Sequence, residues 1–353
     1  YEFYYNIEEP DPDDESVPVL LQNNSIVTPF EAVTGMYSLP GRHDIDPTAI
    51  LAPFYFLFFG LMLSDAAYGL ILTTLCAIIL KKYKPEGTTH RMIKMFMFCG
   101  LSTFMWGALF GGWFGNFFTV AAKTFFGKEF VIRPLWFDPL SEPMRLLVVS
   151  LILGAIHLFV GMGVQAYMDI KDGRPLDALF DIGLWYLLLI GIVLFAFGGK
   201  LGAGAVGIGK IMAIVGAVGI LLTGGRKKKG IFGKLTGGLG SLYGITSYLS
   251  DVLSYSRLLA LGLATGVVAQ VFNTLGSLAG GGIAGSILLI VVFAFGTVFN
   301  IAINALGAFV HSCRLQYVEF FGKFYTGGGR PFAPFERKTK YIKILKEGND
   351  NVK

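Results

Sequence analysis

The chain has 353 residues, of which 54% are hydrophobic and only 15% are charged, and its mean hydropathy is +0.61. This composition excludes an ordinary soluble globular protein and predicts a polytopic membrane protein. The net charge of +5 is uneven, because residues 1–50 hold ten acidic residues against one arginine and no lysine. Basic residues gather in short loops and in the tail, which indicates membrane topology and argues against nucleic-acid binding.

Residues 1–50 are acidic and interrupted by six prolines, with a short β-like run at residues 17–21. Such a segment cannot build much of a core. We expect an acidic linker or collar that joins the membrane part to something upstream. The sequence thus predicts three parts: the linker at residues 1–50, a transmembrane domain at 51–325 and a basic cytoplasmic tail at 326–353.

Seven apolar stretches follow the linker, each long enough for a crossing of about 20 residues. They are residues 51–80, 95–118, 144–167, 176–198, 204–222, 241–275 and 283–324. The last two exceed one perpendicular crossing, so these helices should be steeply tilted or extend into water. The predicted fold is therefore an all-α polytopic membrane protein.

The distribution of lysine and arginine predicts the orientation. It places the loops at residues 81–94 and 226–234 and the tail in the cytoplasm, and the segment at 119–143 outside. The first stretch is ambiguous, because small residues around Asp65 permit either one crossing or a broken helix pair. Asp65 could line a cavity or cap the broken helix, and the sequence leaves both interpretations open.

Arg257 lies near the middle of the stretch at residues 241–275, where a charge costs roughly 2.5–3.5 kcal/mol on insertion scales. Such an arginine persists where it faces a wet cavity or a partner charge, which indicates an ion pathway. The polar residues of this stretch fall on its first half and are Ser247, Ser250, Asp251 and Ser254. Asp251 lies about 120° around the helix from Arg257, so we expect it to face a different, wet space.

The last stretch carries a polar stripe at helical spacing, formed by Asn300, Asn304, Gly307, His311 and Arg314. Gln316 and Glu319 lie on another face, and Glu319 can reach Lys323 at i+4. His311 alone could be a hydrogen-bonded interior histidine or a proton relay. Two intramembrane arginines on two overlong helices are hard to explain by packing and favour a functional role.

Other signals favour structural interpretations. Gly107, Gly111 and Gly115 form a small-residue face that predicts close helix packing, whereas His157 and Gln165 are interpreted as solvated loop chemistry. Residues 204–211, GAVGIGKI, have phosphate-loop spacing but end on isoleucine where Ser or Thr must hold Mg²⁺. We find no catalytic nucleotide site, no metal site and no cofactor motif.

Six segments together resemble the membrane domain of subunit a, called subunit I in prokaryotes, of the V-type and archaeal-type rotary ATPases. They are DIDPTAILAPFYFLFFGLMLSDAAYG, STFMWGALFGGWFG, WFDPL, IHLFVGMGVQ, SYLSDVLSYSRLLALGLA and NALGAFVHSCRLQYVEFFGKFYTGGGRPFAPF, in order over residues 44–335. The resemblance implies eight membrane helices, with a helix pair at residues 51–80 and the last two helices long and strongly tilted. It also leads us to expect a soluble arm before Tyr1.

The resemblance implies a stator subunit in the prokaryotic cell membrane that faces a rotating proteolipid ring, with central-stalk and peripheral-stalk subunits as further partners. Arg257 matches the essential arginine that releases the ion of a ring carboxylate, and Arg314 matches the second arginine. Two half-channels are expected. Candidates for the cytoplasmic one are Asp251, Ser247, Ser250 and Ser254; candidates for the external one are Asn304, His311, Asn300, Glu319 and Gln316.

The chain departs from eukaryotic members at Thr265 and Asn304, where those often carry histidine and glutamate. These changes match the prokaryotic branch and weaken the case for an external carboxylate relay. The alternative function is a secondary transporter that binds an anionic substrate at the two arginines, which would predict internal repeats. A third interpretation is a structural membrane anchor with the arginines as assembly contacts.

Overall fold

The computed structural model describes residues 17–41, 44–127, 130–200, 202–226, 231–278 and 282–333. The remaining residues, which include most of the predicted basic tail and the first part of the acidic linker, lie outside the described residues. Within the described part the chain is almost entirely helical, and its strands amount to one parallel pair of two residues each. The all-α prediction is confirmed.

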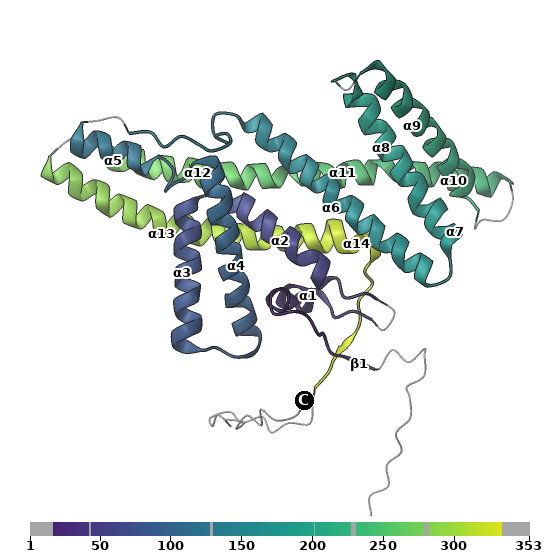
Figure 1. Ribbon diagram of the computed structural model, residues 1–353, viewed down its shortest axis with the longest axis horizontal. Helices are drawn as coiled ribbons and strands as arrows, with labels where there is room; N and C mark the ends of the chain where they lie inside the picture. The colour runs from purple at the N-terminus through teal and green to yellow at the C-terminus, as the bar shows by residue number, and fades with distance from the viewer. Residues whose placement is uncertain are drawn as a thin grey trace, which may run out of the picture.

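The helices follow one another along the chain as shown in Figure 1. The α-helices are α1 (Glu31–Tyr37), α2 (Thr48–Leu63), α3 (Ala66–Tyr83), α4 (Gly87–Phe110), α5 (Phe117–Phe126), α6 (Pro143–Lys171), α7 (Pro175–Asp177), α8 (Leu184–Phe197), α9 (Ala203–Thr223), α10 (Ile231–Tyr243), α11 (Ile245–Ser254), α12 (Ser256–Ser277), α13 (Ile283–Arg314) and α14 (Phe321–Phe324). Two π-helical segments, η2 (Ala178–Gly183) and η4 (Leu315–Phe320), two 3-10 turns, η1 (Thr28–Phe30) and η3 (Gly198–Lys200), and the strands β1 (Pro18–Val19) and β2 (Arg330–Pro331) complete the fold.

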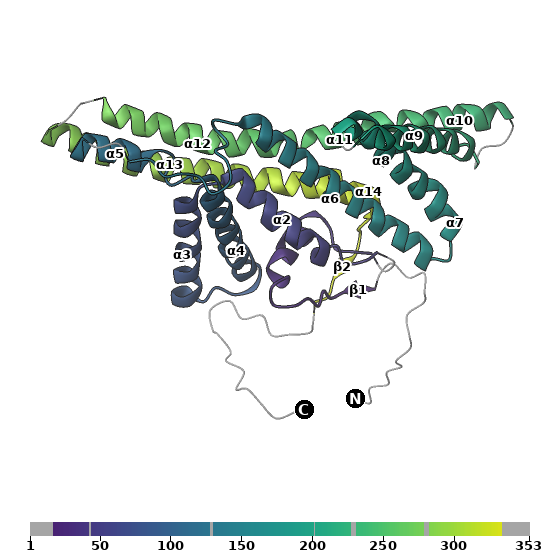
Figure 2. The same ribbon diagram turned by 45° about the horizontal axis from the view of Figure 1, so that its top comes forward.

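Seven of the described helices are long and apolar enough to cross a membrane. They coincide with the predicted stretches, except that the first stretch is divided into α2 and α3. The span at Thr236–Ser277 joins most of α10 to α11 and α12, and the span at Gly285–Phe324 joins α13 to η4 and α14. In both Figure 1 and Figure 2, α12 and α13 run across the direction of the α3–α4 hairpin. The make-up is that of a multi-pass membrane protein.

The first apolar stretch is a helix pair, as the resemblance implied. Its break lies at Ser64, which adopts a left-handed conformation with φ 29°, and at Asp65, which is extended and caps α3. Helix α2 has 16 residues, so it is shorter than the seven candidate spans. A short side chain that accepts hydrogen bonds favours this end of a helix, because the first N–H groups have no partner within the helix.

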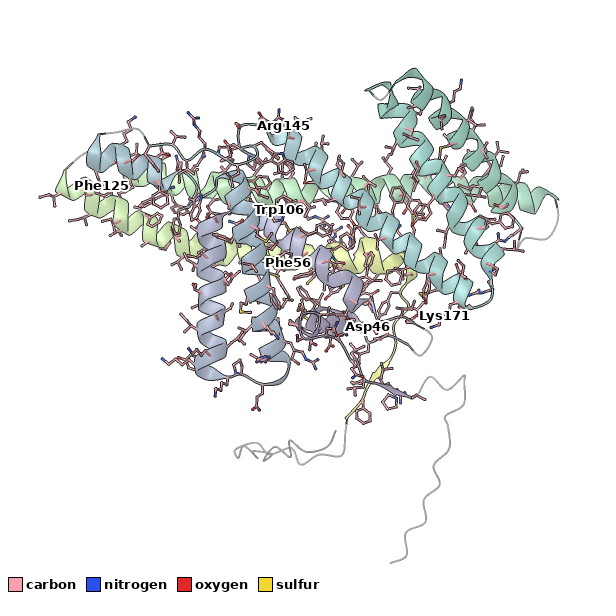
Figure 3. The ribbon with its side chains drawn as sticks, viewed as in Figure 1. Asp46, Phe56, Trp106, Phe125, Arg145 and Lys171 are labelled. Carbon is pink, nitrogen blue, oxygen red and sulfur yellow. The ribbon has the colours of Figure 1, made fainter. Side chains whose placement is uncertain are left out.

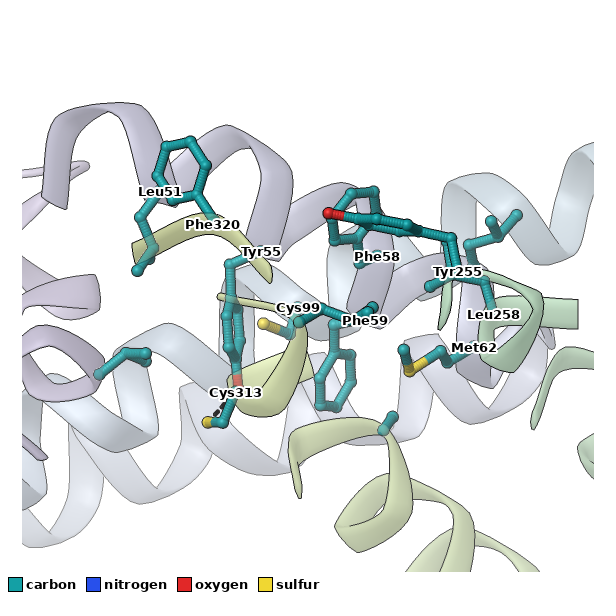
Figure 4. Close-up of a cluster of buried hydrophobic side chains, with 14 of the residues drawn as sticks. Leu51, Tyr55, Phe58, Phe59, Met62, Cys99, Tyr255, Leu258, Cys313 and Phe320 are labelled. Atoms are coloured by element: carbon teal, nitrogen blue, oxygen red, sulfur yellow. Dashed lines mark hydrogen bonds between the residues drawn. The ribbon is translucent and has the colours of Figure 1, made fainter. Parts of the chain in front are cut away.

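Helix α2 forms the centre of the core, because α4, α12 and α13 all pack against it. Figure 4 shows Tyr55, Phe58, Phe59 and Met62 of α2 among side chains from the other helices. The largest of these are Tyr255 at the α11–α12 junction and Phe320 of η4, both fully buried. Burial of the Tyr255 ring fixes the backbone next to Arg257, two residues further along the chain. Burial of the Phe320 ring does the same for the preceding residue, Glu319.

The glycine face predicted in the second stretch is only partly a helix face. Gly107 lies within α4 against the break of the helix pair, where an added Cβ would be 2.0 Å from the backbone nitrogen of Ala66. Helix α4 ends at Phe110, however, and Gly111 and Gly115 adopt positive φ in the turn that follows. The prediction of a helix face is right for Gly107 and wrong for the other two, which lie in the turn because glycine tolerates this conformation. Gly115 still allows a helix to approach closely, since its added Cβ would lie 2.7 Å from the Cβ of Ala269 in α12.

The end of the acidic segment contributes to the core, which the sequence analysis did not expect. Phe30 and Val33 are buried in the main hydrophobic cluster, and the buried carboxylate of Glu31 lies 3.1 Å from Arg91 of α4. The strand β2 and its neighbours also bind this segment, since the hydroxyl of Tyr325 donates a hydrogen bond to the carbonyl of Ser38. Residues 17–41 are therefore a packed element at the end of α13 and α14.

The side chains drawn in Figure 3 place Arg145 and Lys171 at opposite ends of the long helix α6. Beyond Lys171 the chain turns into the α8–α9 hairpin, which has its own small core around Trp185 and Ile220. Arg226 lies 2.5 Å from Asp177 of α7 and 2.8 Å from Asp181 of η2, so the loop after α9 meets the segment that leads into α8.

Candidate functional site

Arg257 lies in the first turn of α12, directly after the junction at Tyr255. Its side chain is partly exposed, and its Nη2 donates a hydrogen bond of 3.1 Å to the hydroxyl oxygen of Ser254. Among the described residues Nη1 has no hydrogen-bond partner. Nη1 is also buried, and a buried donor without a partner in the described part of the chain is an unusual feature that indicates a functional position.

Ser254 also donates a hydrogen bond to Oε1 of Glu319 from η4. Glu319 is only 2% exposed, and among the described residues its Oε2 has no hydrogen-bond partner. The serine hydroxyl therefore lies between the guanidinium and the carboxylate, and the three groups form one cluster that joins α11, α12 and η4. A buried carboxylate needs such partners, because an isolated charge in an apolar interior is costly.

Arg314 and His311 lie at the same level of the helix pair, on α13. Arg314 is exposed and His311 partly so, and the charges of Arg257 and Arg314 are close enough to interact. The Nδ1 atom of His311 has no hydrogen-bond partner within the described part of the chain. The two predicted arginines are thus brought together at one place, as expected for a shared site.

A buried triad lies directly behind the arginine. His157 of α6 is fully buried, and its Nδ1 lies 2.8 Å from the Tyr255 hydroxyl while its Nε2 lies 3.2 Å from Oε1 of Gln316. An amide oxygen only accepts, so Nε2 carries the proton and Nδ1 of the neutral ring accepts from the tyrosine. A Cβ at Gly154 would lie 2.3 Å from the Tyr255 ring, so this glycine makes room for it.

The interpretation of His157 as solvated loop chemistry is wrong, because the side chain is fully buried. The signal that could have found it is its place within 29 helical residues of α6, because an ionisable residue deep in an apolar helix indicates a functional or networked position. Gln165, treated in the same way, is partly buried and donates to Asp169 near the end of the same helix, outside the cluster.

Asp251 has a different neighbour from those expected. Its Oδ2 lies 2.5 Å from Nζ of Lys323, so the predicted reach of Glu319 to Lys323 is replaced by an ion pair between α11 and α14. The expectation that Asp251 does not pair with Arg257 agrees with this geometry. Ser247 and Ser250 are exposed on α11 and lie outside the cluster around Ser254.

Asn300 and Asn304 lie further along the hairpin, away from the tail. Asn300 is fully buried and donates to the Tyr68 hydroxyl and to the carbonyl of Thr265, both at 3.0 Å, and Asn304 donates to Asn300. These residues join α3, α12 and α13 into a buried polar cluster. Tyr68 was not expected from the sequence, since nothing local marks it as a partner of a residue 232 positions away.

Asp65 is a structural cap in this arrangement. Its two carboxylate oxygens accept hydrogen bonds from the backbone nitrogens of Ala67, Tyr68, Phe114 and Gly115, at 2.9–3.2 Å. It therefore fixes both the start of α3 and the turn after α4. A cavity of about 230 Å³ adjoins it, lined also by Asp138 and by Gly262 and Gln270 of α12.

An apolar face adjoins the arginines on the surface of both long helices. Exposed residues recur at helical spacing along α11 and α12, at Leu249, Leu253, Val267, Val271 and Leu275, and along α13, at Phe295, Val298, Ile303, Leu306 and Val310. Gly262 does not belong to this face, because it packs against the carbonyl of Leu61, which lies 3.0 Å from the position of an added Cβ. The exposed face is therefore one of branched and aromatic side chains.

Comparison with known proteins identifies relatives along the whole chain. Residues 245–337 match the V-type ATPase 116kDa subunit family. The A-type ATP synthase subunit I of Methanocaldococcus jannaschii is 36% identical over 96% of this chain and 52% of its own length. That of Thermococcus kodakarensis is 37% identical over 97% and 51%, and the V-type ATP synthase subunit I of Chlamydia trachomatis is 24% identical over 93% and 57%.

The chain spans about half the length of the curated relatives it matches. The matched family region begins at the start of α11 and includes Arg257, Arg314 and Glu319. The relatives extend the similarity to the helix pair and to α6, which supply the remaining residues of the site. The resemblance in the motifs is confirmed: the chain is similar, over nearly all of its own length, to about half of the length of subunit I proteins of the A-type and V-type ATP synthases.

Proposed function

We propose that this chain is the stator part of the membrane sector of a V/A-type rotary ATPase, and that it passes ions to and from a rotating proteolipid ring. The proposal rests on the kinship with subunit I and on one observation. Arg257 lies at the edge of an exposed apolar face, with Nη1 unpartnered among the described residues and a buried carboxylate one serine away. Such a face suits a partner that slides past it in lipid.

The arginine would act on a carboxylate of the ring. A carboxylate in an apolar environment is neutral, carrying H⁺ or Na⁺, because its bare charge is poorly solvated there. When the carboxylate reaches Arg257, the nearby positive charge favours its ionised form and the ion is released. Arg314 adds a second positive charge at the same level, which also hinders a cation from leaking between the two half-channels.

The two half-channels reach Arg257 from opposite ends of the hairpin. We assign Ser247, Ser250 and Ser254 to the cytoplasmic half-channel. Asp251, the fourth candidate, is paired with Lys323 and is left out of the ion path. Asn300, Asn304 and His311 remain candidates for the external one. Gln316 and Glu319 were expected on the external path, but they follow Arg314 toward the tail, where Gln316 contacts His157 and Glu319 contacts Ser254. We therefore move both to the cytoplasmic side.

The test is Arg257→Ala in the intact complex, reconstituted into lipid vesicles and assayed for ATP-driven membrane potential. We expect pumping to be lost while the ring and the ATPase head still purify with the subunit. Arg145→Ala is the matched control, because that side chain is 66% exposed and, among the described residues, forms an ion pair only with Glu142 at the start of its own helix. Normal pumping by Arg257→Ala would refute the proposal.

Co-purification separates this function from the transporter alternative and from the structural anchor. A stator subunit carries the proteolipid ring, the stalk subunits and the head with it through purification, whereas a secondary transporter purifies without them. If the chain were only a structural anchor, it would retain those partners, and the complex that carries Arg257→Ala would pump normally.

A further inference from the structure

Two carboxylates are candidate partners of Lys323: Glu319 by its spacing along the chain, and Asp251 by its position in the structure. It follows Glu319 by four residues, a spacing at which a glutamate and a later lysine pair on one helix. In the structure Lys323 turns to α11 instead, where Nζ lies 2.5 Å from Oδ2 of Asp251. The same Nζ lies 4.3 Å from the centre of the Tyr248 ring, which packs on Trp185 of α8. Helix α11 thus offers Lys323 a counter-ion and an aromatic face.

This choice determines the state of Glu319. Its Oε1 accepts from Ser254, and within the described residues Oε2 has no hydrogen-bond partner. The charge of Glu319 also acts on Arg257, so the carboxylate belongs to the arginine's surroundings. A carboxylate paired with a lysine holds a further cation poorly, because the lysine already favours its bare ionised form. With Lys323 paired to Asp251, Oε2 of Glu319 remains without a hydrogen-bond partner among the described residues.

We propose that Asp251 is a positioning residue that holds Lys323 away from Glu319 and so keeps Glu319 able to take up and pass on the transported cation. This inference rests on the proposed function, since it concerns the ion path to Arg257. Asp251 itself carries no ion in this scheme. Its contribution is the ion pair with Lys323 one turn below the cluster of Ser254, Glu319 and Arg257.

A purely structural ion pair makes a different prediction. The side chains of Asp251 and Lys323 are 19% and 16% exposed, so removing either partner leaves the other charge poorly solvated. A structural role is therefore symmetric, and both single substitutions should do similar damage. The positioning role is asymmetric, because loss of Asp251 releases Lys323 onto Glu319, whereas loss of Lys323 leaves Glu319 open.

The experiment compares Asp251→Asn, Lys323→Met and the double substitution in the intact complex in lipid vesicles. ATP-driven membrane potential is recorded with a voltage-sensitive dye and divided by the amount of assembled complex. We expect Asp251→Asn to slow pumping about tenfold, as a new ion pair of ordinary strength at Glu319 would. Lys323→Met and the double substitution should pump at close to the unmodified rate, as should Asp251→Glu, which retains the pairing.

Equal losses in the two single substitutions, in pumping or in assembly, would overturn the inference and leave a structural ion pair. So would normal pumping by Asp251→Asn, or a double substitution as slow as Asp251→Asn. Arg257→Ala is measured beside them. If that variant pumps normally, the proposed function itself fails. If Arg257→Ala does not pump but Asp251→Asn and Lys323→Met lose equal activity, only the positioning role is rejected.

Discussion

Replacing Asp65 by asparagine tests whether this buried carboxylate is a structural cap. The side chain accepts three backbone N–H groups on Oδ1 and one on Oδ2, and it is 2% exposed. Asparagine has one oxygen. If that oxygen keeps the three bonds, each weakens from a charged to a neutral bond, and the amide group faces the N–H of Gly115.

The magnitude follows from the bond types. A hydrogen bond to a charged group contributes about 1.5–3 kcal/mol and a neutral one about 0.5–1.5 kcal/mol. Three weakened bonds and one lost bond therefore cost about 4–7 kcal/mol if the turn does not relax. The loss should appear as a lower midpoint of thermal unfolding in detergent and as faster proteolysis near Arg133, because the turn after α4 is released from the start of α3.

Asp138→Asn is the matched control, since Asp138 lines the same cavity and its Oδ1, within the described part of the chain, accepts a hydrogen bond only from the backbone nitrogen of Leu140. We expect a change within about 1 kcal/mol there. Equal effects of the two substitutions would contradict the reasoning. A fully stable Asp65→Asn protein whose complex no longer pumps would show instead that Asp65 lies on the ion path.

Two further predictions concern packing and the cluster. Gly107→Ala should destabilise the protein by about 1–3 kcal/mol, because the new methyl group meets the backbone of Ala66. Gly207→Ala in α9 is the control and should not destabilise it, because an added Cβ there meets no atom within 4 Å. Thermal unfolding of both variants in detergent tests this difference. Glu319→Gln keeps an oxygen for Ser254 but removes the charge, so the assembled complex should pump more slowly, and an unchanged rate would take Glu319 off the path.

Much of the membrane architecture could be predicted from hydropathy and spacing. The seven apolar stretches correspond to the helices, because length and composition act locally along the chain. The break of the first stretch was left open by the residues and was decided by the resemblance. The sequence marked Asp65 as a possible cap of the break, but its bonds to the turn after α4 appeared only in the structure, since Phe114 and Gly115 lie about 50 residues away along the chain.

The candidate site shows the same division. Arg257 and Arg314 could be found from the sequence alone, because a charge inside an apolar helix is conspicuous and costly. His157 could not be placed, since its partners Tyr255 and Gln316 lie 98 and 159 residues away. Sequence spacing also suggested that Lys323 pairs with Glu319. In the structure α14 and α11 both pack against α6, and Lys323 forms its ion pair with Asp251 of α11 instead.

The sequence by itself thus determined the class of protein, the number and rough limits of its apolar helices, and the two arginines. The tertiary structure decided which polar groups meet: Ser254 with Glu319, His157 with Tyr255, and Asp251 with Lys323. The physical reason is that hydropathy is a property of each segment, whereas the partner of a buried polar group depends on which helices cross at its depth.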